Sequence, residues 1–498
     1  SEASMALQRD ATDGVQSVHV QVEDPAEIDS IFDGAIVYAK GARMLVMARA
    51  LVGDDALRAG LKQYFINHKY GNAKGDDLWN ALADASGMQV GDIMHSWLEQ
   101  PGYPVVTAAV VDGQLTLSQQ QFFIGEGEEV GRQWQIPLNS NYEAAPAIMK
   151  DQAVTVGDYA KLRDASGQPF RLNVGNNSHF IVKYDQTLLD DILAHVDDLT
   201  AIDQLQLLQD LRLLAEGRQI SYAAVVPLLS RFAASHSTVV NAALYQVAGN
   251  LRKFVTPDSD EEKHLQTLFD QLSAAQVKRL GWLPQAGESN DDQLTRPYVL
   301  SAALYAKSSA AVLAAHELFE GNRDKLATLP ADVRVFILRN EVKNFGSKDL
   351  FDSLLTASRQ TADASYKADI CDALTATTDP ELIKQLVVKF EDADTIKPQD
   401  LRAWFRGVLA NPAGEQAAWD WIRDEWSWLE ATVGGDMEFT TYITVISRVF
   451  HTAERLAEFK AFFEPKINTP GLTREIKMDT KVIASRVALV EDERDAVN

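Results

Sequence analysis

Hydrophobic residues recur with a helical period through the first hundred residues, and short loops separate the helices that this period predicts. The run Ile36–Val52 is apolar almost all round and predicts a helix buried in a larger domain. Only Lys40, Arg43 and Arg49 interrupt the run. Gly41 has a low helix propensity, which indicates a close approach of another backbone at that point. Three further helices are predicted, over Asp54–His68, from Asp76 and Asp77 onward, and over Val90–Gln100.

From Tyr103 the period changes from helical to alternating. Two alternating runs flank Asp112-Gly113, a dipeptide that suits the positive φ angles of a type I′ turn and predicts a β-hairpin. Four more short strands are predicted at Trp134–Leu138, Ala153–Val156, Phe170–Val174 and Phe180–Tyr184. Several short strands at turn-like spacing favour a small β-sandwich.

The helical period returns at Thr187 and continues to the end of the chain. Short loops divide this part, at Thr256–Asp258, Pro284–Asn290 and Asn411–Gly414. Successive short helices without strands or a sharp repeat signature predict an irregular α-solenoid of the HEAT or ARM kind. Its concave face would bind peptide or pack against the preceding domains. The predicted fold is therefore multidomain and mainly α.

Length and charge narrow the classes of function. A chain of 498 residues predicts about three domains, and 46% hydrophobic with 24% charged residues is ordinary for globular proteins. The net charge of −24 repels phosphate backbones and anionic membrane surfaces. No stretch approaches the length of a membrane span. We expect neither a nucleic-acid nor a membrane partner.

A single cysteine, Cys371, excludes an internal disulfide and any zinc site that needs two cysteines. It lies in a helical pattern, which predicts a buried, inert thiol. Cysteine poverty favours a reducing compartment and hence a cytoplasmic protein. The start, Ser-Glu-Ala-Ser, carries no signal-peptide pattern and no initiator methionine, so we expect the chain to begin partway through a longer protein.

Searches for catalytic motifs give mostly negative results. The sequence His316-Glu317-Leu318-Phe319-Glu320 comes closest to a zinc-binding helix, but the His-Glu-x-x-His motif needs a second imidazole where Glu320 stands. We therefore interpret it as a solvated helix edge and expect no metal bound by this chain. No Gly-x-Ser-x-Gly elbow, Walker loop or dinucleotide fingerprint is present. Arg296 and Arg474 have the charge to meet a peptide carboxylate, but surface arginines usually do not, and neither is assigned a role.

The stretch from Phe32 to Ala42 reads Phe-Asp-Gly-Ala-Ile-Val-Tyr-Ala-Lys-Gly-Ala. It resembles the Phe-Asp…Ile-x-Tyr-x-Lys-Gly-Ala segment of the M1 family of zinc aminopeptidases. The resemblance is specific over the first hundred residues and looser beyond. Further matches to family segments are Gly60-Leu61 with Tyr64, His68 to Ala73, Asp77-Leu78-Trp79, Trp97 to Val105, Leu172-Asn173 with Tyr184-Asp185, Gly281-Trp282, Leu294 to Arg296, and Phe462-Phe463 with Gly471-Leu472 and Arg474.

The resemblance implies a catalytic role for Tyr38, which in the family donates its phenol to the oxyanion of the tetrahedral intermediate, opposite the zinc. Without the resemblance, Tyr38 is interpreted as a core aromatic residue with a satisfied hydroxyl. The family order implies three parts: residues 1–101 as the C-terminal helical part of a thermolysin-like catalytic domain, 102–186 as the β-sandwich, and 187–498 as the helical array. The zinc ligands and the amine-binding loop of the family lie upstream of the tyrosine segment.

Two hypotheses follow. In the first, the chain is the C-terminal portion of a zinc-dependent aminopeptidase that acts on peptides, inactive by itself and completed by the N-terminal half of the same protein. In the second, it is a non-catalytic M1-like scaffold that binds peptides or proteins. A pure solenoid adaptor is a third possibility, and the apolar helix at Ile36–Val52 argues against it. Left without its neighbours, that helix is predicted to expose apolar surface, and to be loosely ordered or paired with another copy.

Overall fold

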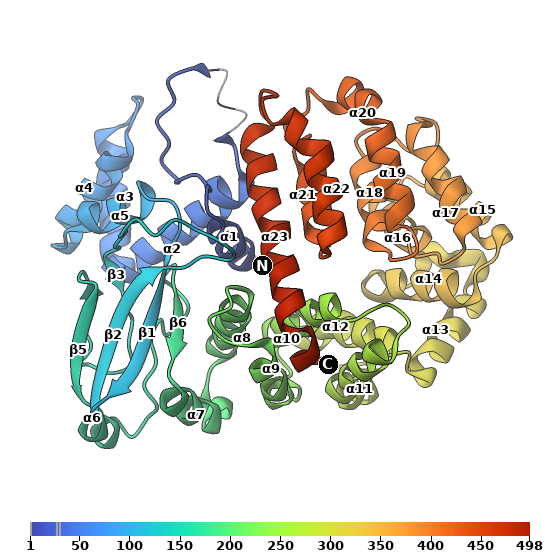
Figure 1. Ribbon diagram of the computed structural model, residues 1–498. Helices are drawn as coiled ribbons and strands as arrows, with labels where there is room; N and C mark the ends of the chain where they lie inside the picture. The colour runs from blue at the N-terminus through green and yellow to red at the C-terminus, as the bar shows by residue number, and fades with distance from the viewer. Residues whose placement is uncertain (1, 26–27, 29–30) are drawn as a thin grey trace. The chain divides into compact units, whose positions relative to one another are not determined.

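The structure is a computed structural model that describes residues 2–25, 28 and 31–498 (Figure 1). Two compact units divide the chain. The first comprises residues 1–222 and 469–486, and the second comprises residues 223–468 and 487–498. The first unit thus contains the N-terminal helices, the β region and the first helices of the predicted array. The predicted boundaries at residues 101 and 186 stay a prediction.

The N-terminal part is helical, as predicted, but the expected helix over Ile36–Val52 consists of two geometries. It opens with a short π-helix, η3 (Ala35–Lys40), and continues as α2 (Gly41–Val52). The Gly41 N–H donates to the Ile36 carbonyl, which is the wider bond that defines a π-turn. Around this segment lie α1 (Glu2–Asp10), α3 (Asp54–Asn67), α4 (Gly75–Ser86) and α5 (Val90–Leu98).

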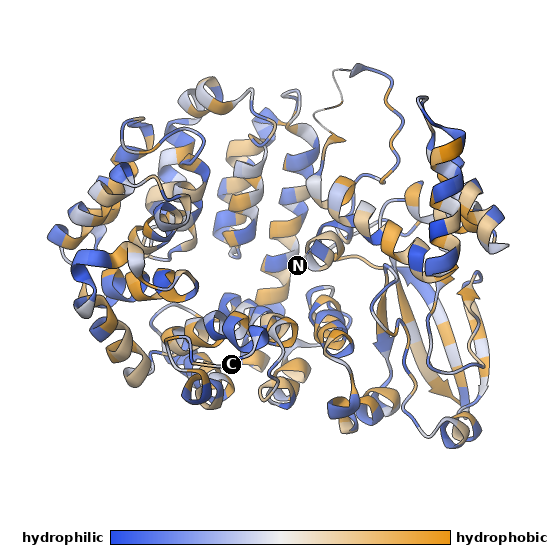
Figure 2. Ribbon diagram, turned by 180° about the vertical axis from the view of Figure 1, so that it is seen from behind, coloured by the Kyte–Doolittle hydropathy of each residue, from blue (hydrophilic) through white to orange (hydrophobic). Residues whose placement is uncertain are grey.

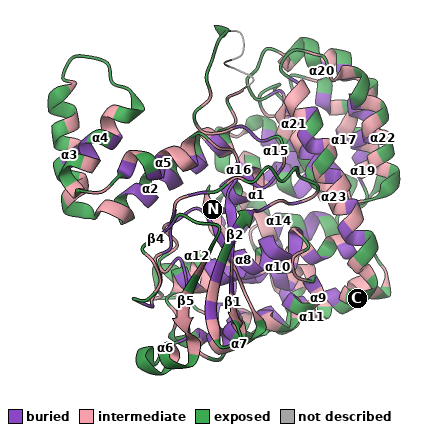
Figure 3. Ribbon diagram, turned by 60° about the vertical axis from the view of Figure 1, so that its left-hand side comes forward, coloured by how far each residue is buried: buried purple, intermediate pink, exposed green. Residues whose placement is uncertain are grey.

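One expectation for this segment was wrong. A Cβ at Gly41 would meet only the Ile36 carbonyl at 3.9 Å, so no other backbone approaches closely there. Such an approach occurs instead at Gly60 in α3, where a Cβ would lie 3.2 Å from the Ala81 carbonyl oxygen in α4. Within this chain Leu45 and Val46 are about half exposed, so the burial of this helix in a larger domain stays a prediction. Figure 3 shows α3 exposed along most of its length.

The β region follows the predicted hairpin. β1 (Pro104–Val111) and β2 (Gln114–Gln121) pair antiparallel across Asp112 and Gly113, whose φ angles of 50° and 77° are those of the expected turn. With β5 (Ala153–Asp158) and β6 (Ile181–Tyr184) they form a four-stranded sheet in the order β5-β2-β1-β6, in which β6 runs parallel to β1. A two-stranded ribbon of β3 (Ile136–Pro137) and β4 (Ile148–Met149) shares the hydrophobic core of this sheet.

The predicted strand at Phe170–Val174 is absent, since the structure has a turn there. Asn173 adopts a φ of 53°, and its side chain accepts from the Ser178 N–H and donates to the Ser178 carbonyl. These local bonds compete with a strand ladder. One helix, α6 (Tyr159–Ser166), was not predicted.

The remaining described residues are helical and contain no strand, as predicted. α7 (Gln186–Ala194) and α8 (Ala201–Glu216) belong to the first unit. α9 (Tyr222–Val225) crosses the boundary, since Tyr222 belongs to the first unit and residue 223 begins the second. The second unit continues with α10 (Thr238–Asn250), α11 (Asp260–Leu280), α12 (Asn290–Tyr305), α13 (Ser309–Gly321), α14 (Ala331–Phe345), α15 (Lys348–Gln360), α16 (Ala364–Leu374), α17 (Pro380–Val388), α18 (Leu401–Ala410), α19 (Glu415–Asp424), α20 (Trp426–Val433), α21 (Thr441–Val449) and α22 (Ala453–Phe463).

Many of these helices carry hydrophilic residues next to hydrophobic ones along their length (Figure 2). Serine and aspartate side chains cap many of them, as Ser259 does for α11 and Asp363 for α16. The last helix, α23 (Thr473–Val497), begins in the first unit and ends in the second. Cys371 lies buried in α16, and burial raises the pKa of its thiol, as expected for an inert cysteine.

Within the described residues, no single helix is both long and apolar enough to span a membrane. The pair α12 and α13, bent by 113° between them, passes that test of length and composition when the two are taken together.

Candidate active site

Tyr38 projects from the π-helix η3 into solvent. Its side chain is 64% exposed, and the ring of Phe32 contacts it edge-on with the centroids 5.6 Å apart. The interpretation of Tyr38 as a buried core aromatic is therefore wrong. The phenol lies on a surface where a second group can approach it.

Asp33 fixes the start of the π-helix. Its carboxylate accepts from the Ala35 N–H at 3.0 Å, and its backbone carbonyl accepts from Ile36 and Val37. The second carboxylate oxygen accepts from Arg9 Nε at 2.7 Å. Asp33 thus satisfies N–H groups that a helix start leaves without partners.

Lys40 lies on the other side of the same turn and is fully buried. Its ammonium is 2.8 Å from Asp10 Oδ2 and donates to the Gly102 carbonyl at 3.1 Å. A buried ammonium is costly unless it is paired and hydrogen-bonded, and both partners are present here.

Asp10, at the end of α1, also has no exposed side-chain surface and accepts three hydrogen bonds. Besides Lys40, they come from His179 Nε2 at 2.9 Å and from the Gly102 N–H at 3.0 Å. Burial works to raise the pKa of Asp10, but the Lys40 ammonium and the His179 donor outweigh it, so the pKa lies below its ordinary value. The carboxylate is therefore ionised in the folded protein.

His179 joins Asp10 to Arg43. Arg43 Nε donates to His179 Nδ1 at 3.0 Å, so Nδ1 carries no proton and the proton on Nε2 points at Asp10. Burial lowers the pKa of His179 to about 4, against the opposing effect of Asp10, and the imidazole is neutral at pH 7. Arg43 also donates to the Ser178 carbonyl at 2.8 Å, and burial lowers its pKa to about 10.

Sequence reasoning assigned no role to Asp10, Arg43 or His179. Asp10 and His179, which are hydrogen-bonded to each other, are 169 residues apart in the sequence, so no local spacing connects them. One signal was available: Lys40 and Arg43 interrupt an otherwise apolar run, and polar groups on a buried face need partners.

The motif-like residues of α13 come together with a third side chain. His316 Nδ1 lies 2.8 Å from Glu341 Oε2 in α14, and the imidazole stacks on the ring of Phe345. Ligand atoms of His316, Glu320 and Glu341 lie within 4.8 Å of one another, which makes this the group among the described residues with the composition to hold a cation. Arg323 binds the Glu320 carboxylate and competes with any cation for it.

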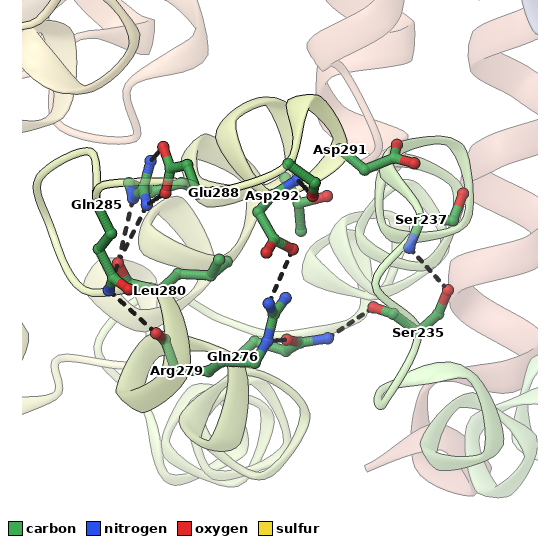
Figure 4. A network of polar contacts seen from close by, with 12 residues as sticks. Ser235, Ser237, Gln276, Arg279, Leu280, Gln285, Glu288, Asp291 and Asp292 are labelled. Carbon is green, nitrogen blue, oxygen red and sulfur yellow. Dashed lines mark hydrogen bonds and ion pairs between the residues drawn. The ribbon is translucent and has the colours of Figure 1, made fainter.

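The two arginines left without a role already have partners. Arg296 is 1% exposed and donates to the carbonyls of Leu280 and Gly281 and to Glu288. Figure 4 shows the network around the loop between α11 and α12, where Gln285 also donates to the Leu280 carbonyl. Arg474 donates to Gln16 at 3.2 Å. The guanidinium of Arg296 is thus closed to a peptide carboxylate.

An apolar groove lies near the tyrosine segment, among α2, α3 and α4. Its volume is about 280 Å³, and its lining residues are Leu45, Val46, Ala48, Arg49, Leu57, Leu61, Leu78 and Leu82. Further large hydrophobic side chains of α3 are exposed, including Phe65 at 66% and Ile66 at 58%. The predicted apolar exposure of this region is therefore confirmed, whereas loose order or pairing with a copy stays a prediction.

Comparisons with known proteins match both ends of the chain to one group of enzymes. Residues 1–97 match the Peptidase family M1 domain, and residues 170–485 match the ERAP1-like C-terminal domain. The chain is 62% identical to Aminopeptidase N of Lactobacillus helveticus and 60% identical to that of Lactobacillus delbrueckii subsp. lactis, over its whole length. Aminopeptidase M1 of Arabidopsis thaliana is 29% identical over 98% of the chain. The chain spans 59% of the length of the Lactobacillus relatives.

Proposed function

The chain belongs to the M1 peptidase family, and from this premise we propose that it is the C-terminal portion of a zinc-dependent aminopeptidase that removes N-terminal residues from peptides in the cytosol. The observation that carries the proposal is the solvent-facing phenol of Tyr38 on a turn that buried charges hold from behind.

In this proposal Tyr38 is the electrophilic partner of the substrate carbonyl. An attacked peptide carbonyl develops negative charge on oxygen, and a fixed neutral donor stabilises that charge. The hydroxyl of a tyrosine side chain is a neutral donor of this kind. The exposure of Tyr38 leaves its hydroxyl accessible to a substrate held on the same face.

The residues of this chain do not fit the zinc site that such an enzyme needs beside Tyr38. The sequence contains no His-Glu-x-x-His, and the group at His316, Glu320 and Glu341 belongs to the second unit, with Arg323 on one of its carboxylates. We therefore assign the zinc ligands, and the groups that hold the substrate amine, to a part of the protein outside this sequence.

The partner proposed for the exposed face of α2, α3 and α4 is that same remaining part, the N-terminal half of the catalytic domain. Two observations support this. The face is apolar and grooved, and the M1 domain match covers only residues 1–97 of a chain that spans 59% of its relatives. Exposed apolar patches of this kind mark interaction surfaces.

The first experiment tests the chain alone. Purified chain, supplied with zinc and an aminoacyl anilide, is expected to show no turnover above the blank, because the metal and amine sites are not among its residues. Turnover that survives repurification and follows the protein would contradict the proposal.

The second experiment tests Tyr38 in the enzyme at the full length of its relatives. We expect Tyr38→Phe to lower kcat by about 10²–10³-fold with KM little changed, since it removes one oxyanion donor. Tyr70→Phe is the control, because Tyr70 is 98% exposed in the turn that follows α3 and has no assigned role. Equal activity of the two variants would favour the non-catalytic scaffold.

A further inference from the structure

We infer that Asp10, Lys40, His179 and Arg43, called here the buried network, are positioning residues for Tyr38. They hold the π-helix from behind and tie it to the β region. The inference rests on the proposed function for its catalytic meaning, whereas its structural part concerns this chain alone.

The turn of η3 places Tyr38 and Lys40 on opposite sides of the helix. Side chains around a helix advance by about 100° per residue, so residues two apart point to nearly opposite sides. Tyr38 is 64% exposed and Lys40 is fully buried, as this spacing requires. Anchoring the Lys40 ammonium therefore sets the direction in which the phenol points.

The direction of Tyr38 also depends on the π-helical geometry of η3. A π-helix is a rare geometry that contains one more residue per turn than the α-helix, and it persists where the surroundings fix it. Asp33 binds the first N–H groups of η3, and Lys40 anchors its end. Relaxation of η3 to α-helical geometry would rotate the residues before Gly41 by roughly 100° about the axis. Tyr38 would then leave its present direction.

The Asp10 carboxylate that pairs with Lys40 is itself held by other residues. Asp10 accepts hydrogen bonds from both Lys40 and His179. His179 precedes the strand β6, which pairs with β1 in the sheet. Because both imidazole nitrogens are engaged, by Asp10 on one side and Arg43 on the other, the ring cannot turn without breaking its hydrogen bonds to two buried charged groups. The rings of Trp97 and Tyr103 also contact His179 edge-on. The position of Tyr38 thus depends on residues from α1, α2 and the β region.

The test uses two readouts on matched variants. Lys40→Met keeps the length of the side chain and removes its charge, and Asp10→Asn/Lys40→Met removes both charges of the pair. His179→Gln keeps an N–H donor for Asp10 and has no acceptor at the position of the imidazole Nδ1 that Arg43 binds. It is used if the lysine variants do not fold. The control is Arg334→Met in the second unit, where an equally buried guanidinium donates to Asp369 at 2.6 Å.

The first readout is the resonance of 3-fluorotyrosine placed at position 38 of this chain, followed by ¹⁹F NMR. We expect the buried-network variants to shift or split this resonance and Arg334→Met to leave it unchanged. The second readout is kinetics of the full-length enzyme at a temperature where all variants are folded. There we expect Lys40→Met to lower kcat about ten-fold or more with KM within about two-fold, as removal of a transition-state contact requires.

The outcomes separate the two claims. An unchanged ¹⁹F resonance in every folded network variant, or equal losses of kcat in Lys40→Met and Arg334→Met, would overturn the positioning role. A shifted resonance combined with full activity of Tyr38→Phe would leave the positioning of residue 38 standing and overturn the proposed function instead.

Discussion

At the scale of single residues, His179 shows how burial sets a protonation state. Two buried charges, Asp10 and Arg43, flank its ring and fix one tautomer. The imidazole accepts no further proton until the pH falls to about 4, because burial lowers its pKa from an ordinary 6.5. A neutral bridge between two charged groups costs less to bury than a third charge would.

This protonation state makes stability depend on pH. Between pH 6.5 and about 4 the unfolded chain binds a proton at His179 that the folded chain does not, so the free energy of unfolding falls as the pH falls. We expect a loss of up to about 3 kcal/mol across this window from this group. The pKa of Asp10 is also lowered, and its contribution disappears only below its ordinary value of 3.8.

Urea unfolding at pH 8 and pH 5 measures the effect. His179→Gln is expected to be less stable than the wild type at pH 8 and to lose less stability on acidification, because it has no proton to bind in this window. His95→Gln is the control, since His95 is exposed and its partner Asp76 is exposed too. Parallel pH slopes for the wild type and His179→Gln would contradict the prediction.

At the scale of elements, two helices of the N-terminal part pack through a glycine. A Cβ at Gly60 in α3 would lie 2.7 Å from Leu82 Cδ2 and 3.2 Å from the Ala81 carbonyl oxygen. A Cβ at Gly249 in α10 would meet nothing within 4 Å. The same substitution is therefore expected to have opposite effects at these two helical positions.

We expect Gly60→Ala to destabilise the chain by about 1–2 kcal/mol, because α3 and α4 must separate slightly, which outweighs the gain in helix propensity. Gly249→Ala is expected to stabilise by up to about 1 kcal/mol. Denaturant unfolding of both variants checks the pair. A stabilising Gly60→Ala would mean that Leu82 and the backbone of α4 move aside at little cost.

Some of these elements are predictable from local sequence patterns and others are not. Hydrophobic periodicity predicts the N-terminal helices, and Asp112-Gly113 predicts the β1–β2 turn, because both signals are local. The π-helix η3 has no local signature, since the contacts of Lys40 with Asp10 and Gly102 hold its end. The Phe170–Val174 prediction failed because the side-chain bonds of Asn173 outweigh an apolar run. For the candidate site, Tyr38 followed from family resemblance, and the residues behind it required the fold.

At the scale of the whole molecule, a net charge of −24 coexists with an apolar face on α2, α3 and α4. A strongly charged chain stays dispersed through mutual repulsion, and an exposed apolar patch opposes that effect. Leu45 and Val46 are the hydrophobic side chains of the groove lining that are most exposed, at 56% and 45%. If the remainder of the catalytic domain covers this face, the same residues are buried in the complete enzyme.

If that face is covered in this way, substitution of both residues is expected to have different consequences in the chain alone and in the full-length enzyme. In the chain alone, Leu45→Ser/Val46→Ser is expected to reduce binding of the dye ANS and leave the free energy of unfolding nearly unchanged. In a full-length enzyme whose remaining half covers this face, the same change would remove two buried side chains, and we expect it to lower the free energy of unfolding by roughly 3–5 kcal/mol. Val388→Ser, at a residue 72% exposed in the second unit, is the control and should alter neither form. An enzyme that tolerates Leu45→Ser/Val46→Ser without loss of stability would show that this face stays open to solvent, and the remaining half of the catalytic domain would then have to dock elsewhere.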